Sequence, residues 1–467
     1  MVCGPKGSGK STFVRLLTNR LVTGPMAPEL ESMPHLHKPV TVCILDLDPG
    51  QPDFSPPGQL SLVHIRNPVL GPPFTHPHTG DNTSTRLVRA HSIGAISPKD
   101  DPEYFLTCAA DLIAHYQALL KNYPTCPLII NCPGYVLGSA LEIMTRLLEA
   151  TSTTDIVYMS QAGPGEVVHA LRSKSGKSRF HELPSQPCGL TTRTPADFRA
   201  MQYLSYFHQD TPVHGNLRWN SNSINTRRSI CLDYSHETSD ILGILSLGEH
   251  PAADFLHTVL EGCLVSVCIV ENESAAAAAL LDVLRTPTHD LPYWPHDESG
   301  LTTPFSPSHS HMVGLAWITR VDIEKHQLRL QTPISPIVLD QILVKSKLGD
   351  PKVYLIRGSL DTPGWAYQEQ LHLAQHAEKR RRNDQLVAAS DAENLTIDTR
   401  QLPANYDEVG SEADDSIAHA PWVKALKPGQ GFEKRWRVRR DLGRPVRQQG
   451  LGNSISNGAR SAQVAKA

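Results

Sequence analysis

The chain begins with a complete P-loop pattern, G-x-x-x-x-G-K-[ST], followed by an apolar spacing typical of a helix. Glycines in such a loop let the backbone curl, so that its N–H groups and the N-terminus of the next helix face phosphate groups. Lys10 then reaches the β- and γ-phosphates, and the Ser11 hydroxyl ligates magnesium. We therefore predict that ATP and Mg²⁺ bind here. The loop residues are Gly4, Pro5, Lys6, Gly7, Ser8, Gly9, Lys10, Ser11 and Thr12.

Beyond this loop, short apolar runs alternate with helical spacing as far as about residue 225. Three buried strands and three helices are expected, at 40–47, 128–131 and 155–159 and near 11–21, 103–121 and 139–150. This alternation is typical of an α/β fold with a doubly wound parallel sheet. Only three residues precede Gly4, which leaves the central strand short. Either a neighbouring segment replaces this strand, or the sequence is a truncated version of a longer chain, and we expect the second.

Composition and the pattern of apolar residues divide the chain into three parts. We predict a P-loop domain over 1–225, a separate strand-rich domain over 226–370, and a charged tail over 371–467. The tail begins with a helix pattern and is expected to be largely disordered from residue 385 onward. Its basic run 379–382 is either a nuclear import signal or the solvated face of a helix. A second basic block, 434–447 around Trp436, is a candidate contact for a partner or for RNA.

Charge and hydropathy restrict the kinds of partner. Residues 371–467 hold 16 Lys and Arg against 12 Asp and Glu, which leaves the first 370 residues at −7 within a total of −3. An acidic ordered part does not indicate nonspecific nucleic-acid binding, so any RNA contact is expected in a local groove. No stretch approaches the roughly 20 apolar residues that span a bilayer, so we expect a soluble intracellular protein with no membrane partner.

Two aspartates follow the apolar run at 40–45, in the string Asp46-Leu47-Asp48-Pro49-Gly50-Gln51. A carboxylate at the carboxyl end of a strand beside a P-loop can hold magnesium or take the proton of an attacking hydroxyl. Alternate residues of a strand point to opposite faces, so only one of the two faces the phosphates. We assign this role to Asp48, which is nearer the strand end, and expect Asp46 to cap the next turn.

Four segments together resemble the polynucleotide 5′-hydroxyl-kinase family. They are the P-loop GPKGSGKST, DLDPGQPDFSPPGQLSL at 46–62, NCPGYVLG at 131–138 and LSYFH at 204–208. The chain looks most like the fungal branch that acts in pre-ribosomal RNA processing, rather than the sister branch in mRNA 3′-end formation. The resemblance covers roughly residues 1–370 and is strongest over the first 210. It implies ATP-dependent phosphorylation of RNA that carries a 5′-hydroxyl end.

The resemblance also implies roles for individual residues. Asp48 matches the carboxylate proposed to activate the 5′-hydroxyl, and Gln51 lies in the same motif near metal and phosphates. Tyr135 stands where the family usually has a tryptophan that stacks on the terminal base. A base stacked on an aromatic side chain is worth roughly 1–3 kcal/mol, which a tyrosine can also supply. The alternative for Tyr135 is an ordinary packed aromatic after a turn.

A mobile lid usually brings positive charge over the γ-phosphate. This family has an arginine-bearing lid, and the matching segment here is about 188–208. Arg193 and Arg199 precede and begin a helix pattern in that segment, so both are candidates for neutralising charge in the transition state. The alternative is that they are surface arginines of an amphipathic helix. Ser97-Pro98 resembles a family segment near the substrate strand, and its role stays open.

Further expectations rest on the resemblance alone. Family members carry an additional domain before the P-loop, and the strand-rich domain supports the kinase core and helps to hold an endoribonuclease subunit. Nuclear, nucleolar rRNA processing is the expected setting.

Two other classes of protein remain as alternatives. A kinase of a small metabolite shares the P-loop and lid chemistry, and a nucleotide-binding scaffold subunit would bind ATP without transferring phosphate. A GTPase is disfavoured because no N-K-x-D string occurs.

Overall fold

The computed structural model describes residues 1–24, 41–76, 84–160, 163–185, 193–210, 218–248, 250–271, 282–296, 305–348 and 352–394. All of them belong to one compact unit, Met1–Ala425. Residues 188–192 of the predicted lid, the basic block at 434–447 and the tail from residue 395 lie outside the described residues.

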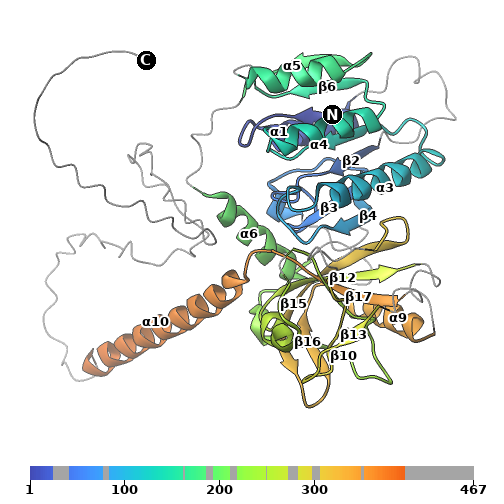
Figure 1. The fold of residues 1–467 in the computed structure, drawn as a ribbon. Helices are drawn as coiled ribbons and strands as arrows, with labels where there is room; N and C mark the ends of the chain where they lie inside the picture. Colours follow the sequence, from blue (N-terminus) through green and yellow to red (C-terminus); the bar gives the residue numbers. More distant parts are fainter. Residues whose placement is uncertain are drawn as a thin grey trace, which may run out of the picture. The chain divides into compact units, whose positions relative to one another are not determined.

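The first sheet has seven strands in the order β4-β3-β2-β5-β1-β6-β7 (Figure 1). Neighbours from β2 to β7 run parallel, whereas β3 and β4 add an antiparallel edge. This confirms the predicted parallel-dominated α/β fold, and the antiparallel edge was not predicted. The strands are β1 Val2–Cys3, β2 Val42–Asp46, β3 Gln59–Ile65, β4 Thr85–Ser92, β5 Leu128–Asn131, β6 Asp155–Tyr158 and β7 Arg179–Glu182.

Strand β1 is short but lies at the centre of the sheet, between β5 and β6. Val2 is paired with Asn131 on one side and with Val157 on the other. The backbone N–H of Met159 donates to the Cys3 carbonyl at 2.8 Å. Among the described residues β1 itself fills the central position, and the P-loop leaves directly from the middle of the sheet.

Helices cover both faces of this sheet. Alternate strand residues feed two cores: Cys43 and Leu45 pack with the side of the sheet that carries α3, α4 and α5, and Ile44 packs with α1. Such alternation is what a strand buried on both faces requires. The helices are α1 Lys10–Thr23, α3 Pro102–Leu120, α4 Ser139–Ala150 and α5 Gly165–Lys174, close to the predicted positions.

The second sheet confirms the strand-rich character of the C-terminal region. It has eight mostly antiparallel strands in the order β10-β16-β15-β12-β17-β11-β14-β13. They are β10 Ile230–Asp233, β11 Ile244–Ser246, β12 Leu264–Val270, β13 Leu284–Arg285, β14 Pro292–Tyr293, β15 Ser310–Asp322, β16 Gln327–Gln331 and β17 Lys352–Arg357. Helices α7 Leu256–Leu260 and α9 Pro336–Leu348 accompany them. A separate two-stranded sheet pairs β8 Gln209–Asp210 with β9 Arg218–Trp219.

A buried arginine joins the two large sheets. Arg89 of β4 pairs with Asp111 of α3 at 2.9 Å and with Glu271, just after β12, at 3.0 Å. Its remaining donors bond to the carbonyls of Pro307 and Ser310. A buried charge is stable only when paired and hydrogen-bonded, and these partners come from helix α3 on the first sheet and from residues in or next to β12 and β15 of the second sheet.

Close backbone contact makes a second joint, after β17. The N–H of Ser359 donates to the Gly94 carbonyl at 2.7 Å, and a Cβ built on Gly358 would lie 1.9 Å from that oxygen. The segment 358–361 therefore packs directly on the loop that follows β4.

We predict that Gly358→Ala destabilises the fold by about 1–3 kcal/mol, because the new methyl group forces this joint apart. Gly364→Ala is the matched control, because a Cβ built on Gly364 meets nothing within 4 Å. It should stay within about 0.5 kcal/mol of wild type. Urea unfolding measures the stability of both variants. Equal stability would show that the close contact between Gly358 and Gly94 does not stabilise the fold.

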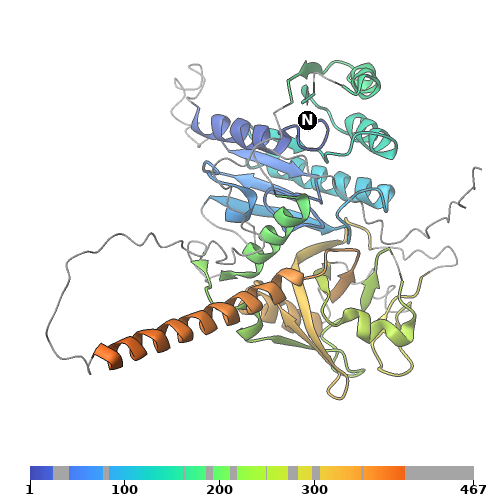
Figure 2. The ribbon, with the colours of Figure 1, turned by 90° about the vertical axis from the view of Figure 1, so that its left-hand side faces the viewer.

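Two further helices, α6 Pro195–Phe207 and α10 Gly364–Asn394, pack against the second sheet through residues such as Tyr206 and Trp365. Helix α6 begins with a capping box in which Thr194 and Asp197 exchange side-chain and backbone hydrogen bonds. Figure 2 shows α6 beside the first sheet. It also shows the long helix α10, which meets the rest of the molecule at the N-terminal end of the helix and then extends away from it. Helix α10 continues through 385–394, the beginning of the segment expected to be largely disordered.

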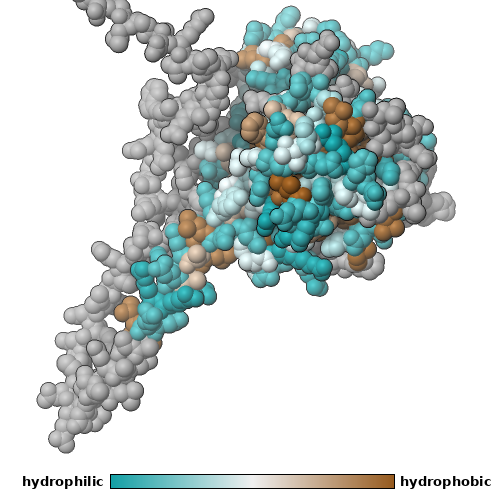
Figure 3. Space-filling view, turned by 60° about the horizontal axis from the view of Figure 1, so that its bottom comes forward, coloured by the Kyte–Doolittle hydropathy of each residue, from teal (hydrophilic) through white to brown (hydrophobic). Residues whose placement is uncertain are grey.

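The basic run 379–382 lies on α10 with its side chains exposed, as the solvated-face alternative requires. Among the exposed hydrophobic residues of the same helix are Leu371 and Leu373. Figure 3 shows a mostly hydrophilic face on which brown hydrophobic residues form separate small patches. Within the described residues, no helix combines the length and the apolar composition needed to cross a bilayer.

Candidate nucleotide and substrate site

The P-loop has the backbone shape that its glycines predict. Gly4, Gly7 and Gly9 have φ angles of 143°, 77° and 95°, in a region where side chains with a Cβ are strained. Lys10 is the first residue of α1 and is buried. Its Nζ donates to the Pro5 carbonyl at 3.0 Å, so the ammonium group lies within the curl of the loop.

A pocket of about 570 Å³ opens beside the P-loop. Four segments far apart in the sequence line it: the P-loop, the loop after β2, the loop after β4 and the loop after β5, with the start of α6 at its edge. The pocket thus lies at the carboxyl ends of the parallel strands, where α/β sheets bind ligands. The lining residues are Lys6, Gly7, Gly9, Lys10, Ser11, Thr12, Asp48, Gly50, Gln51, Ile96, Ser97, Pro98, Lys99, Pro133, Gly134, Tyr135, Pro195 and Arg199.

The two aspartates at the end of β2 and just beyond it differ in position. Asp46 is fully buried and accepts hydrogen bonds from the backbone N–H of Asp48 and of Asp53 and from the Asn131 amide. It holds the turn. Asp48 is half-buried and lines the pocket, and its Oδ1 accepts from the N–H groups of Gly50 at 3.1 Å and of Gln51 at 3.3 Å.

Burial adjusts the charges of the pocket. Loss of water raises the pKa of Asp48, and the nearby Lys10 ammonium opposes that rise. Burial lowers the pKa of Lys10, with Asp48 opposing. A carboxylate with a raised pKa is a better proton acceptor than an ordinary aspartate. Burial also raises the pKa of Asp46 to about 7.

Tyr135 lines the pocket as predicted, but one face of its ring has a cation above it. The Nζ of Lys99 lies 3.5 Å from the ring centroid, a cation–π contact. Ser97 and Pro98, whose role the sequence left open, lie on the same wall. Lys99 itself was missed, although it follows directly after the Ser97-Pro98 pair that the sequence had singled out.

The two candidate arginines differ in position. Arg199 lines the pocket and pairs with Asp361 through its Nε and Nη2 atoms. Arg193 is half-buried just before α6 and is not among the residues that line the pocket.

Three of the P-loop residues predicted for nucleotide binding do not line the pocket. They are Gly4, Pro5 and Ser8, which belong to the loop but lie outside the pocket lining.

The pocket residues fit a nucleotide with magnesium. Ser8 Oγ is buried without a hydrogen-bond partner among the described residues, as expected of a loop shaped around an absent group. Magnesium keeps several waters and needs only one or two carboxylates beside the phosphates. The hydroxyl of Ser11 and the carboxylate of Asp48 line the same pocket and provide this donor set.

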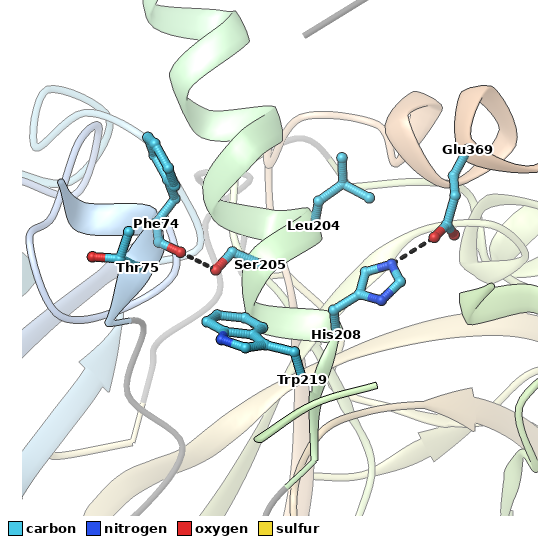
Figure 4. Close-up of a pocket in the computed structure, with 7 residues that line it drawn as sticks. All are labelled: Phe74, Thr75, Leu204, Ser205, His208, Trp219 and Glu369. Carbon is cyan, nitrogen blue, oxygen red and sulfur yellow. Dashed lines mark hydrogen bonds and ion pairs between the residues drawn. The ribbon is translucent and has the colours of Figure 1, made fainter. Parts of the chain in front are cut away.

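A second hollow, of about 440 Å³, lies at the other end of α6 (Figure 4). Figure 4 shows the His208 imidazole pointing at the Glu369 carboxylate, 2.6 Å away, with the Trp219 indole across the hollow. Helix α6 thus contributes to both pockets, with Arg199 near its start and Leu204 and Ser205 near its end. The lining residues are Phe74, Thr75, Leu204, Ser205, His208, Trp219 and Glu369, of which only the three from the string LSYFH at 204–208 had been singled out in the sequence.

Comparison with known proteins shows to which family the chain is related. Residues 4–209 match the family described as the mRNA cleavage and polyadenylation factor CLP1 P-loop. The polynucleotide 5′-hydroxyl-kinase grc3 of Aspergillus fumigatus is 36% identical, over 91% of this chain and 56% of that protein. The chain belongs to the same family as this kinase. The polynucleotide 5′-hydroxyl-kinase GRC3 of Gibberella zeae is 34% identical, over 95% of this chain and 60% of its own length.

This chain therefore spans a little over half the length of these relatives of the polynucleotide 5′-hydroxyl-kinase family. A solved structure of wild-type Clp1p with a segment of Pcf11p has a TM-score of 0.50 and 15% identity. It covers 77% of this chain and 73% of the Clp1p chain. At that identity the likeness concerns the fold alone, and the fold it supports includes both large sheets.

Proposed function

We propose that this protein transfers the γ-phosphate of ATP to the 5′-hydroxyl end of an RNA. The observation that carries the proposal is that one pocket joins Lys10 and Ser11 of the P-loop to Asp48 and to the aromatic ring of Tyr135. A phosphate donor site, a proton acceptor and a platform for a base thus line one space. The names of the curated relatives support the same activity.

The residues of the pocket have distinct tasks in this proposal. The N–H groups of the P-loop and the Lys10 ammonium bind the phosphates, and Asp48 takes the proton of the attacking hydroxyl. Gln51 orients substrate groups beside Asp48, and Arg199 neutralises charge that develops during transfer. Arg193 joins Arg199 in this role if the lid moves further over the pocket. Magnesium, held by Ser11 and Asp48, would supply further positive charge to the phosphates when bound.

The cellular setting is part of the proposal. We propose a place in rRNA processing, with an endoribonuclease as partner subunit and the nucleus, and within it the nucleolus, as location, on the resemblance of the sequence to the fungal branch of the family. Co-purification of the tagged full chain with an RNA-cleaving partner would test this setting.

The experiment that tests the function compares acceptors. The protein is incubated with γ-labelled ATP and either a short RNA with a 5′-hydroxyl end or a mixture of free nucleosides and small alcohols. Label in the RNA alone is the expected result. Label in a small acceptor would favour the metabolite kinase, and ATP binding without any transfer would favour the scaffold.

We predict that Tyr135→Ala raises the KM for RNA by about 5- to 150-fold, because stacking of one base is worth roughly 1–3 kcal/mol. The KM for ATP should change little. Tyr135→Phe keeps the ring and is the matched control, with kinetics near wild type. Steady-state kinetics with both substrates would show it, and an unchanged KM for RNA in Tyr135→Ala would mean that Tyr135 is an ordinary packed aromatic.

A further inference from the structure

We infer that Asp361, which belongs to the segment between β17 and α10, is a positioning residue for phosphoryl transfer and acts through Arg199. This inference rests on the proposed function and deepens it. If so, a residue that follows the second sheet helps to fix helix α6, and with it Arg199, beside the nucleotide pocket.

The guanidinium group of Arg199 is held along one edge. Its Nε donates to Oδ2 of Asp361, and its Nη2 lies 3.4 Å from Oδ1. The Arg199 side chain is only 12% exposed, whereas Asp361 is 36% exposed. Nη1 makes no hydrogen bond to any residue that the structure describes, so its donors stay available to the pocket that Arg199 lines. A guanidinium group is planar, so pairing along one edge also fixes the direction of its remaining N–H donors.

The carboxylate of Asp361 is itself fixed relative to the pocket. Its segment is anchored by the backbone hydrogen bond from Ser359 to Gly94, two residues before the pocket residue Ile96. Leu360 packs against Gly58, where a built Cβ would lie 2.5 Å from the leucine side chain. The N–H of Gly58 in turn donates to the Pro49 carbonyl at 2.8 Å, next to Asp48. One short segment therefore contacts the loops after β2 and β4 as well as helix α6.

This arrangement has a direct consequence for catalysis. An arginine side chain has many rotamers, and ordering it only when the γ-phosphate arrives would cost entropy at that step. Pairing with Asp361 orders it beforehand. The pair should therefore act on the transfer step rather than on binding of RNA.

The test is a double-mutant cycle on Asp361→Asn and Arg199→Ala, with kcat and both KM values measured. We expect Asp361→Asn to lower kcat by about 10- to 100-fold, the order of loss that misplacing a catalytic group causes. The KM for RNA should stay within about twofold, whereas the KM for ATP should rise by up to about tenfold, because Arg199 also meets the γ-phosphate of bound ATP. In the Arg199→Ala background, Asp361→Asn should have no further effect on kcat.

The matched control is Asp290→Asn. Asp290 also pairs with an arginine, Arg285, at 2.9 Å and is 42% exposed, but neither residue lines the pocket. Asp290→Asn should leave kcat unchanged. The same loss of kcat from Asp361→Asn with and without Arg199 would overturn the inference, since Asp361 would then act on the fold, and no loss at all would also overturn it.

A binding measurement separates this inference from the proposed function. In a competition assay with a fluorescent nucleotide, Asp361→Asn should weaken the binding of ATP by about tenfold and leave the binding of ADP unchanged. Only ATP has the γ-phosphate that Arg199 meets. This difference should vanish in the Arg199→Ala background. Absence of RNA phosphorylation by wild type would refute the proposed function, while an unchanged ratio of ATP to ADP affinity in Asp361→Asn would refute the role of Asp361.

Discussion

Replacing Asp48 by asparagine should reduce the rate of phosphate transfer to RNA by about 100- to 10,000-fold, the usual contribution of a general base. The amide has nearly the shape of the carboxylate but accepts no proton. Its oxygen can still accept from the N–H groups of Gly50 and Gln51, so the turn should keep its form. ATP should still bind, because the P-loop is unchanged.

The pH dependence of the wild type provides a second readout for Asp48. Burial raises the pKa of Asp48 in the free protein. A base works only when deprotonated, so kcat/KM should fall as the pH drops through this raised pKa, above the roughly 3.9 of an ordinary aspartate. Asp254→Asn, a charge removed from an exposed position, is the control and should behave as wild type. Full transfer activity in Asp48→Asn would remove Asp48 from the chemical step.

Replacing Lys10 by alanine should lower transfer by at least about 100- to 1,000-fold, the cost of removing one preorganised group that meets developing charge. The loss should include binding of ATP, because Lys10 contributes to the ground state as well. The buried ammonium lies beside Asp48, so its removal leaves that carboxylate with the weaker influence of Lys6 and raises the pKa of Asp48 further.

A matched control for Lys10→Ala is Lys174→Ala on α5, whose ammonium pairs with Glu149 at the surface. It should keep wild-type kinetics. Isothermal titration with ATP and single-turnover transfer would be measured for both variants. If Lys10→Ala still bound and transferred phosphate as wild type does, the P-loop would not be the donor site.

The core of the site was predictable because its signals are local. A P-loop needs glycines at set positions, and an aspartate at the end of a buried strand must emerge at the edge where the P-loop lies. The strands at 128–131 and 155–159 and the helix at 139–150 were also predicted closely, since each is a short apolar run or a clear helical spacing.

Features that depend on distant partners were not predictable. Strand β4 carries Arg86, Arg89 and His91, and such a number of charged and polar side chains is typical of an exposed segment. Arg89 is nevertheless buried, because Asp111 and Glu271 neutralise its charge. The pairing of Arg199 with Asp361 joins residues that no local pattern relates. The second hollow likewise gathers Trp219 and Glu369 from separate segments.

The most direct test of the central claim is the location of the transferred phosphate. Wild-type protein is mixed with γ-labelled ATP, magnesium and one of two RNAs of identical sequence, with either a 5′-hydroxyl or a 5′-phosphate end. The product is then digested to nucleotides. The predicted result is label only in the terminal nucleotide of the 5′-hydroxyl RNA and none in its phosphorylated counterpart. Label in neither RNA, despite ATP binding that depends on Lys10, would contradict the claim.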